Sequence, residues 1–127
     1  MPRTLNVEAT LSRIDNDLER LDQLYQIALE ELPRWEKRMR EKIDTGDTEQ
    51  IRKIAHAYKG SSATLGAEKL QELLMNLEND MKNSAFDKED IEDRFQQFTE
   101  GVNSLIDTIN EYLNNKKITA KHGIPGE

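Results

Sequence analysis

The spacing of the apolar residues constrains the fold of this chain more than any other feature. From about Asp17 to Lys42, and at the residue after it, apolar side chains recur at steps of three and four, which is the spacing of one face of an α-helix. They are Leu18, Leu21, Tyr25, Ala28, Leu32, Trp35, Met39 and Ile43. Later segments repeat this spacing, and none shows a β-strand alternation of convincing length. The sequence therefore predicts an all-α protein.

Residues that end and start helices divide this pattern into elements. Gly46 can end one helix and Asp47 can cap the next, because glycine tolerates the left-handed conformation and aspartate accepts hydrogen bonds from free N–H groups. Gly66 and Asp87 mark two further boundaries. The predicted helices are Val7–Ile14, Asp17–Lys42, Thr48–Leu65, Ala67–Lys82 and one that follows Asp87. Long amphipathic helices with short loops favour an antiparallel up-down-up-down four-helix bundle, with the short N-terminal helix across one end.

We expect one domain over residues 1–116 and a flexible C-terminal tail over residues 117–127. A chain of 127 residues has the length of a single domain. Its last residues, KKITAKHGIPGE, contain two glycines and a proline and lose the apolar period. Within the second predicted helix, Pro33 removes one backbone hydrogen bond and should bend that helix or split it in two.

Composition and charge exclude several kinds of function. The formal net charge of −7 disfavours nucleic-acid binding, since phosphate groups would be repelled. The chain has no cysteine, which rules out disulfides and thiolate metal sites, and we predict no metal site of any kind. No apolar run approaches the roughly 20 residues that cross a bilayer, and the N-terminus lacks the apolar core of a signal peptide. We expect a cytoplasmic monomer that binds neither membrane nor nucleic acid.

The segment AHAYKGSSATLGA, residues 55–67, contains the candidate site. On a helical wheel the buried stripe comprises Ile51, Ile54, Ala55, Tyr58, Ser62 and Leu65. His56 lies about 140° from the centre of that stripe and so faces solvent. Gly60 lies one turn on, where an exposed glycine costs about 1 kcal/mol relative to alanine. Together with Ala57 and Ala63 it leaves the imidazole clear of its neighbours, and we expect this small-residue surface to receive a partner protein.

His56 is the candidate reactive group. A neutral imidazole is a nucleophile near pH 7 and can take up a phosphoryl group on one ring nitrogen. Phosphoryl transfer needs positioning and charge neutralisation from the protein more than covalent help. Lys59, one turn away, can supply positive charge to the phosphoryl group. Arg52 and Lys53 extend this into a basic island that we predict to contribute to partner docking.

Two residues of the same segment are interpreted as structural. Ser62 falls on the inner side of the helix, where its hydroxyl should bond back to a carbonyl one turn earlier or across to another helix. Gly66 should let this helix end and the next begin at a sharp angle.

The segment resembles a known signature. The matching residues, His56, Lys59, Gly60, Ser62, Gly66 and Ala67, form H-x-x-K-G-x-S-x-x-x-G-A. This resembles the signature of histidine-containing phosphotransfer (HPt) domains, and the segments ELPRW and LEND and the TGD turn resemble the same family more loosely. The resemblance implies a four-helix bundle that carries phosphoryl groups, with Lys59 beside the phosphoryl group and Gly60 clearing space for the partner.

The resemblance also implies the partners. His56 would accept a phosphoryl group from an aspartate of one receiver domain and pass it to an aspartate of another, in a phosphorelay that includes a hybrid sensor histidine kinase and response regulators. The chain itself would bind no cofactor, because the Mg²⁺ used in transfer belongs to the receiver domain. It would be a phosphocarrier without an ATP site of its own.

Two alternatives stay open. Phosphoacceptor domains of chemotaxis-type kinases share the H-x-x-K-G motif, but a kinase domain phosphorylates them in trans, and they often place acidic or further polar partners around the histidine. The wheel positions that flank His56 hold no acidic residue, which favours the relay. The other alternative is a helical adaptor that docks receiver or kinase domains without chemistry, and the intact motif disfavours it.

Overall fold

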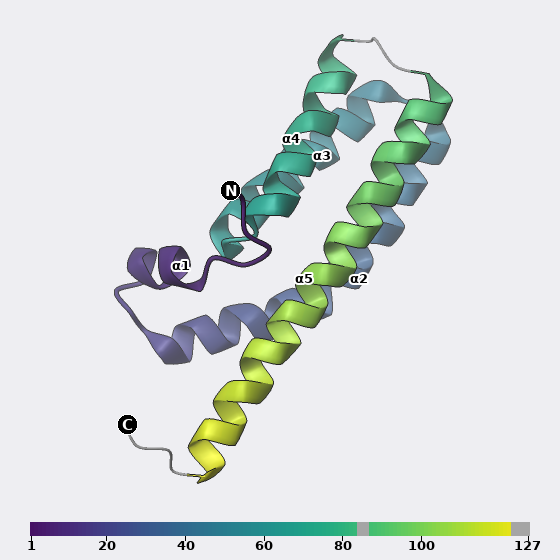
Figure 1. The fold of residues 1–127 in the computed structure, drawn as a ribbon. Helices are drawn as coiled ribbons and strands as arrows, with labels where there is room; N and C mark the ends of the chain where they lie inside the picture. The colour runs from purple at the N-terminus through teal and green to yellow at the C-terminus, as the bar shows by residue number, and fades with distance from the viewer. Residues whose placement is uncertain (84–86, 123–127) are drawn as a thin grey trace.

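The structure, a computed structural model, describes residues 1–83 and 87–122. These residues form helices and loops without a β-strand, which confirms the predicted all-α fold. The helices are α1 (Val7–Arg13), α2 (Leu18–Thr45), α3 (Thr48–Leu65), α4 (Glu68–Asn83) and α5 (Lys88–His122). Figure 1 shows α3 and α4 side by side, with α2 and α5 alongside them, and the short α1 at one end.

The four long helices share one apolar core. Each contributes the stripe of residues that its sequence period predicts, including Leu32 and Met39 from α2 and Ile109 from α5, all of which are fully buried. Trp35 of α2 stacks on Tyr58 of α3 with ring centroids 4.3 Å apart, and these rings join the two helices near the middle of the bundle. The outer side of α3, opposite this core, remains uncovered.

The predicted helix boundaries are confirmed where glycine and aspartate mark them. Gly46 ends α2 in the left-handed conformation, with φ of 72°. Asp47 caps α3 by accepting hydrogen bonds from the backbone N–H groups of Glu49 and Gln50. Asp87 accepts one from the N–H of Asp90 at the start of α5. Local side-chain chemistry therefore fixes where α3 and α5 begin.

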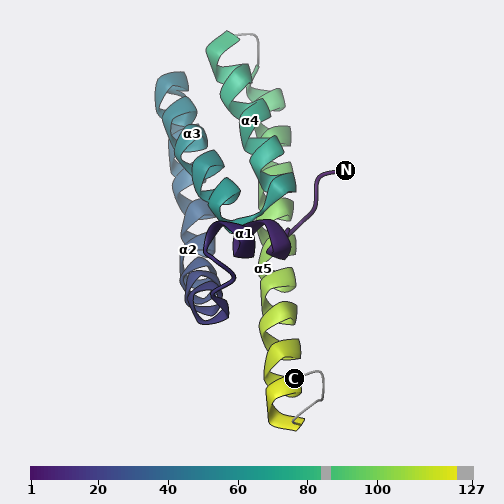
Figure 2. The same ribbon diagram turned by 90° about the vertical axis from the view of Figure 1, so that its left-hand side faces the viewer.

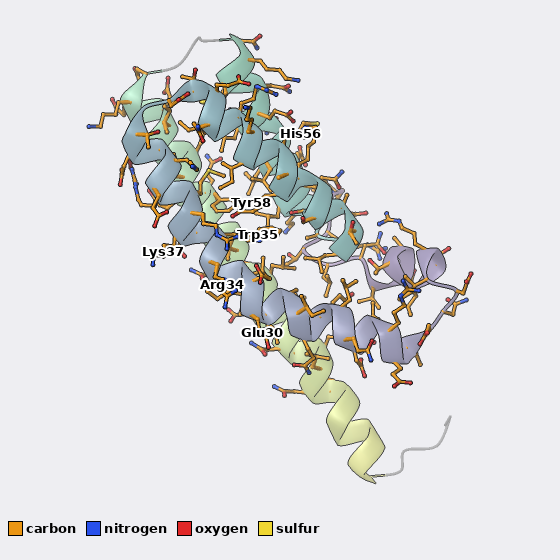
Figure 3. The ribbon with its side chains drawn as sticks, turned by 180° about the vertical axis from the view of Figure 1, so that it is seen from behind. Glu30, Arg34, Trp35, Lys37, His56 and Tyr58 are labelled. Carbon is orange, nitrogen blue, oxygen red and sulfur yellow. The ribbon has the colours of Figure 1, made fainter. Side chains whose placement is uncertain are left out.

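Pro33 bends α2 without dividing it. The helix is continuous from Leu18 to Thr45 with the proline inside it, and Figure 3 shows it changing direction near Glu30, one turn before the proline. The missing N–H and the bulk of the ring account for a bend at this place. The N-terminal part of α2 turns away from the bundle axis toward α1.

The turn between α3 and α4 is closed by Gly66 and covered by α1. Gly66 has φ of 79°, which confirms the predicted sharp change of direction. Its carbonyl accepts a hydrogen bond from Asn6 N–H at 2.7 Å, and Thr10 of α1 is buried against the same turn. Figure 2 shows α1 crossing the ends of α3 and α4. The N-terminal helix therefore holds the α3–α4 corner in place.

The C-terminal boundary differs from the prediction of a tail that starts at residue 117. Helix α5 continues through residues 117–122 and ends at His122. The reason is that the first glycine after residue 116 is Gly123, and no proline precedes it, so nothing in KITAKH interrupts a helix. Residues 123–127, the rest of the predicted tail, lie outside the described residues.

Substitution of Gly66 tests the role of this corner. A Cβ at Gly66 would lie 2.5 Å from the carbonyl oxygen of Asn6 and 2.7 Å from Thr10 Oγ1. At Gly46, which also has positive φ, a Cβ would meet no atom of the described residues within 4 Å, apart from its neighbours in the chain. Gly46→Ala should therefore cost only the strain of the left-handed conformation, about 1–2 kcal/mol, and Gly66→Ala should cost more. Urea denaturation of both variants measures this, and equal losses would contradict the contact with α1.

Candidate functional site

His56 projects outward from α3, as its place on the helical wheel predicts. Its side chain is 64% exposed, whereas Ile51, Ala55 and Tyr58 of the opposite stripe are buried. Figure 3 shows His56 at the outer edge of the bundle and Trp35 and Tyr58 at the contact between α2 and α3. The imidazole is thus open to a second protein.

A buried carboxylate from α4 holds the inner side of the imidazole. Glu78 Oε2 lies 2.7 Å from His56 Nδ1, and Glu78 Oε1 accepts a hydrogen bond of 2.7 Å from Lys59 Nζ. Lys82 Nζ lies 3.8 Å from Glu78 Oε2. The Glu78 side chain is only 3% exposed. We call these four residues, His56, Lys59, Glu78 and Lys82, the Glu78 cluster.

Glu78 is ionised at neutral pH. The hydrogen bond from Lys59 lowers the pKa of the Glu78 carboxyl below its usual value; burial acts in the opposite direction, and the hydrogen bond from His56 adds to the lowering. A buried charge of this kind is stable only because it is paired and hydrogen-bonded. The carboxylate is therefore a fixed negative charge directly behind the imidazole.

This charge determines which ring nitrogen can react. An ionised carboxylate can only accept a hydrogen bond, so a neutral His56 carries its proton on Nδ1 and donates it to Glu78. The lone pair then lies on Nε2, the nitrogen that Glu78 does not contact. A carboxylate that accepts a hydrogen bond from one imidazole nitrogen fixes the orientation of the ring and the position of its proton. His56 Nε2 is thus a nucleophile held in one orientation.

Sequence reasoning missed Glu78. The wheel of α3 shows correctly that no acidic residue flanks His56 on its own helix, but the acidic partner comes from α4. One signal was present in the sequence: Glu78 follows Leu77 directly and lies one turn after Leu74, at the edge of the buried stripe of α4. A charged residue at such a position requires a partner from a neighbouring helix.

Gly60 has the open surroundings that the sequence predicted. It is exposed, and among the described residues a Cβ at this position would meet no atom within 4 Å beyond its own stretch of helix. Ala57 is exposed as well and Ala63 is half-buried. The carbonyl of Ala63 accepts a hydrogen bond of 2.5 Å from Arg13, the last residue of α1. The small side chains therefore leave the surface of α3 around His56 without bulky groups.

The predicted basic residues do not all behave alike. Arg52 pairs with Glu49 one turn earlier on α3, with Nη2 and Oε1 2.5 Å apart. Lys53 is exposed on the outer side. Lys59 belongs to the Glu78 cluster, so part of its charge is balanced before any phosphoryl group arrives. The structure brings Lys59 to the site and leaves the docking role of Arg52 and Lys53 as a prediction.

Ser62 is buried, but the hydrogen bond expected for it is absent. Its Oγ has no partner among the described residues. The back-bonding to a carbonyl one turn earlier occurs instead at Ser61, to Ala57, and at Thr64, to Gly60. Ser62 therefore contributes a small side chain to the core, where Ala67 is also fully buried.

Comparison with known proteins identifies the family. The family model of the Hpt domain matches residues 6–115, so the chain belongs to the Hpt domain family. Its structure is similar to that of the HPT domain from a sensor hybrid histidine kinase of Shewanella, with a TM-score of 0.74 at 18% sequence identity. The match covers 88% of this chain and 95% of that one. The comparison with curated proteins gives no match.

Membership of this family gives the general function. The protein has a phosphotransfer role in two-component signalling, as a carrier of phosphoryl groups, and its partners are receiver domains and histidine kinases. In the part of the chain that the structure describes, no helix is long and apolar enough to cross a bilayer. The same residues contain no group of three or more potential metal ligands.

Glu78→Gln tests the charge behind the imidazole. The glutamine has nearly the same shape but no negative charge with which to form an ion pair with Lys59, so we expect a loss of about 1–3 kcal/mol in the free energy of unfolding at pH 7. Because the folded pKa of Glu78 is lowered, its contribution is present above the pKa of the unfolded chain and disappears as the pH falls through the folded pKa. Urea denaturation at pH 7 and pH 3 should show the difference from the unsubstituted protein shrinking in acid. A difference independent of pH would contradict this assignment.

Proposed function

We propose that the protein is a phosphorelay intermediate. His56 Nε2 accepts a phosphoryl group from the aspartyl phosphate of one receiver domain and transfers it to an aspartate of a second receiver domain. The observation that carries this proposal is the exposed imidazole whose Nδ1 is held by the buried, ionised Glu78. This arrangement presents one nitrogen to a partner and removes the other from reaction.

In the transfer step one bond forms and one breaks, and no other group of this chain gains or loses a proton. The Nε2 lone pair attacks phosphorus in line, the bond from phosphorus to the aspartate oxygen breaks, and the aspartate leaves as a carboxylate. The proton stays on Nδ1, so the ring becomes a phosphorylated imidazolium. Glu78 stabilises the positive charge that develops on the ring. Transfer to the second receiver is the same step in reverse.

The remaining residues have supporting roles in this proposal. Gly60 leaves room for the receiver domain beside the imidazole, and the Mg²⁺ that transfer requires is bound by the receiver. The sequence assigns Lys59 to the phosphoryl group; in the structure its ammonium is bound to Glu78. Arg52, Lys53 and the small residues of α3 form the surface on which a receiver would dock.

Glu78 also favours a second candidate function. Chemotaxis-type phosphoacceptor domains often place acidic partners around the histidine, and this chain has one. Such a domain would be phosphorylated by the ATP-binding domain of a kinase. Incubation with a phosphorylated receiver and, separately, with a histidine kinase domain and ATP distinguishes the two, since the relay predicts rapid label from the receiver.

His56→Gln tests the proposed function. The unsubstituted protein, incubated with a phosphorylated receiver domain, should take up a label that is stable in alkali and labile in acid. NMR spectroscopy should place the phosphoryl group on Nε2. His56→Gln should take up no label and keep its helical circular dichroism, because the side chain is exposed. Label on the substituted protein, or on Nδ1 of the unsubstituted one, would refute the proposed mechanism.

Substitutions of Gly60 test whether this residue leaves room for the receiver domain beside the imidazole. Gly60→Ala should increase the free energy of unfolding by about 1 kcal/mol, since alanine favours the helix and its Cβ meets no other group. Gly60→Leu should fold equally well but slow transfer from the receiver by about tenfold or more, equivalent to at least 1.4 kcal/mol of lost docking energy. Stability and transfer rates of both variants provide the measurement. Parallel losses of stability and transfer would show that Gly60 serves the fold instead.

A further inference from the structure

Lys82 differs from Lys59 in how Glu78 holds it. Lys82 Nζ lies 3.8 Å from Glu78 Oε2, which is beyond hydrogen-bond distance, and its side chain is 53% exposed. Lys59 Nζ donates to Glu78 Oε1 at 2.7 Å, and its side chain is 28% exposed. Lys59 is therefore fixed on the carboxylate, whereas Lys82 can turn toward solvent on its long, flexible stem.

Lys82 approaches the same oxygen that holds the imidazole. Glu78 Oε2 accepts the hydrogen bond from His56 Nδ1 at 2.7 Å and lies 3.8 Å from Lys82 Nζ, so one oxygen atom is close to both groups. Lys82 follows Glu78 by one turn of α4, so the two side chains share one face of that helix. Since the Lys82 side chain is long and 53% exposed, we expect that its ammonium can turn toward the outer side of the imidazole while α4 stays in place.

Phosphorylation changes the charge balance of the Glu78 cluster. A phosphoryl group adds between one and two negative charges on the outer side of His56. If Lys59 moved to meet them, the buried Glu78 would lose its strongest partner, which is costly. Lys82 can leave Glu78 at a smaller cost, because its contact is longer than a hydrogen bond and because Lys59 and His56 still hold the carboxylate. Of the two lysines, Lys82 is therefore the one available for the new charge.

We infer that Lys82 neutralises the phosphoryl group on His56, moving from Glu78 Oε2 to a phosphoryl oxygen once that group is in place. The inference rests on the proposed function and assigns a different role to each of the two lysines. Lys59 keeps the buried Glu78 paired, and Lys82 contacts the phosphoryl group. Because this contact lies within the chain, it acts whichever receiver is the partner.

The test uses a small phosphoryl donor, so that it needs no partner protein. His56 is phosphorylated with phosphoramidate, and ³¹P NMR follows both the rate of loading and the titration of the phosphoryl group. A nearby cation lowers the pKa of a phosphoryl group, so Lys82→Gln should raise that pKa by about half a unit to one unit. Loading should slow about two- to fivefold, as expected for the loss of an exposed charge contact. Lys82→Arg, which keeps the positive charge, should have the phosphoryl pKa and the loading rate of the unsubstituted protein.

Lys69→Gln provides the matched control. It makes the same charge change in an exposed residue of the same helix, thirteen positions away, and should leave the titration and the loading rate unchanged. An unshifted titration in Lys82→Gln would overturn the inference, and a shift in Lys59→Gln alone would assign the contact to Lys59. Failure of the unsubstituted protein to be phosphorylated at His56 would instead refute the proposed function, and this inference with it.

Discussion

The ionised carboxylate of Glu78 is the feature on which the rest of the site depends. A charge removed from water must be surrounded by partners, and here they come from both α3 and α4. The orientation of His56, the position of Lys59 and the distance between the two helices are therefore linked to one another. A change in any of them would remove a partner from a buried charge, so the imidazole is held from within the protein and free on its outer side.

The fold supplies the rigidity that this arrangement needs. Gly66 turns the chain sharply between α3 and α4, and this sets which residues of the two helices face each other. Helix α1 packs on the turn through Asn6 and Thr10, while α2 and α5 fill the other side of the core (Figure 2). Reactive groups placed on packed helices are positioned more accurately than groups on loops, and here both the histidine and its carboxylate lie on helices.

Much of this could be predicted from the sequence because it depends on local spacing. The helix period gave the buried stripes and the outward direction of His56, and Gly46, Asp47 and Gly66 gave the boundaries. Glu78 could not be assigned in the same way, since its contact with His56 depends on which faces of α3 and α4 meet. The hydroxyl of Ser62 was misjudged for a related reason: its surroundings are set by neighbouring helices, not by its own turn.

The open surroundings of Gly60 have a consequence for how the partner specificity of such a carrier can evolve. Among the described residues, a side chain at Gly60 would meet no group beyond its own stretch of helix, so replacing this glycine leaves the core and the buried charge intact. Affinity for one partner or another can be altered there without a penalty in folding. A residue that blocks transfer at this position is expected to keep or raise the thermal stability, so only a transfer experiment detects the damage.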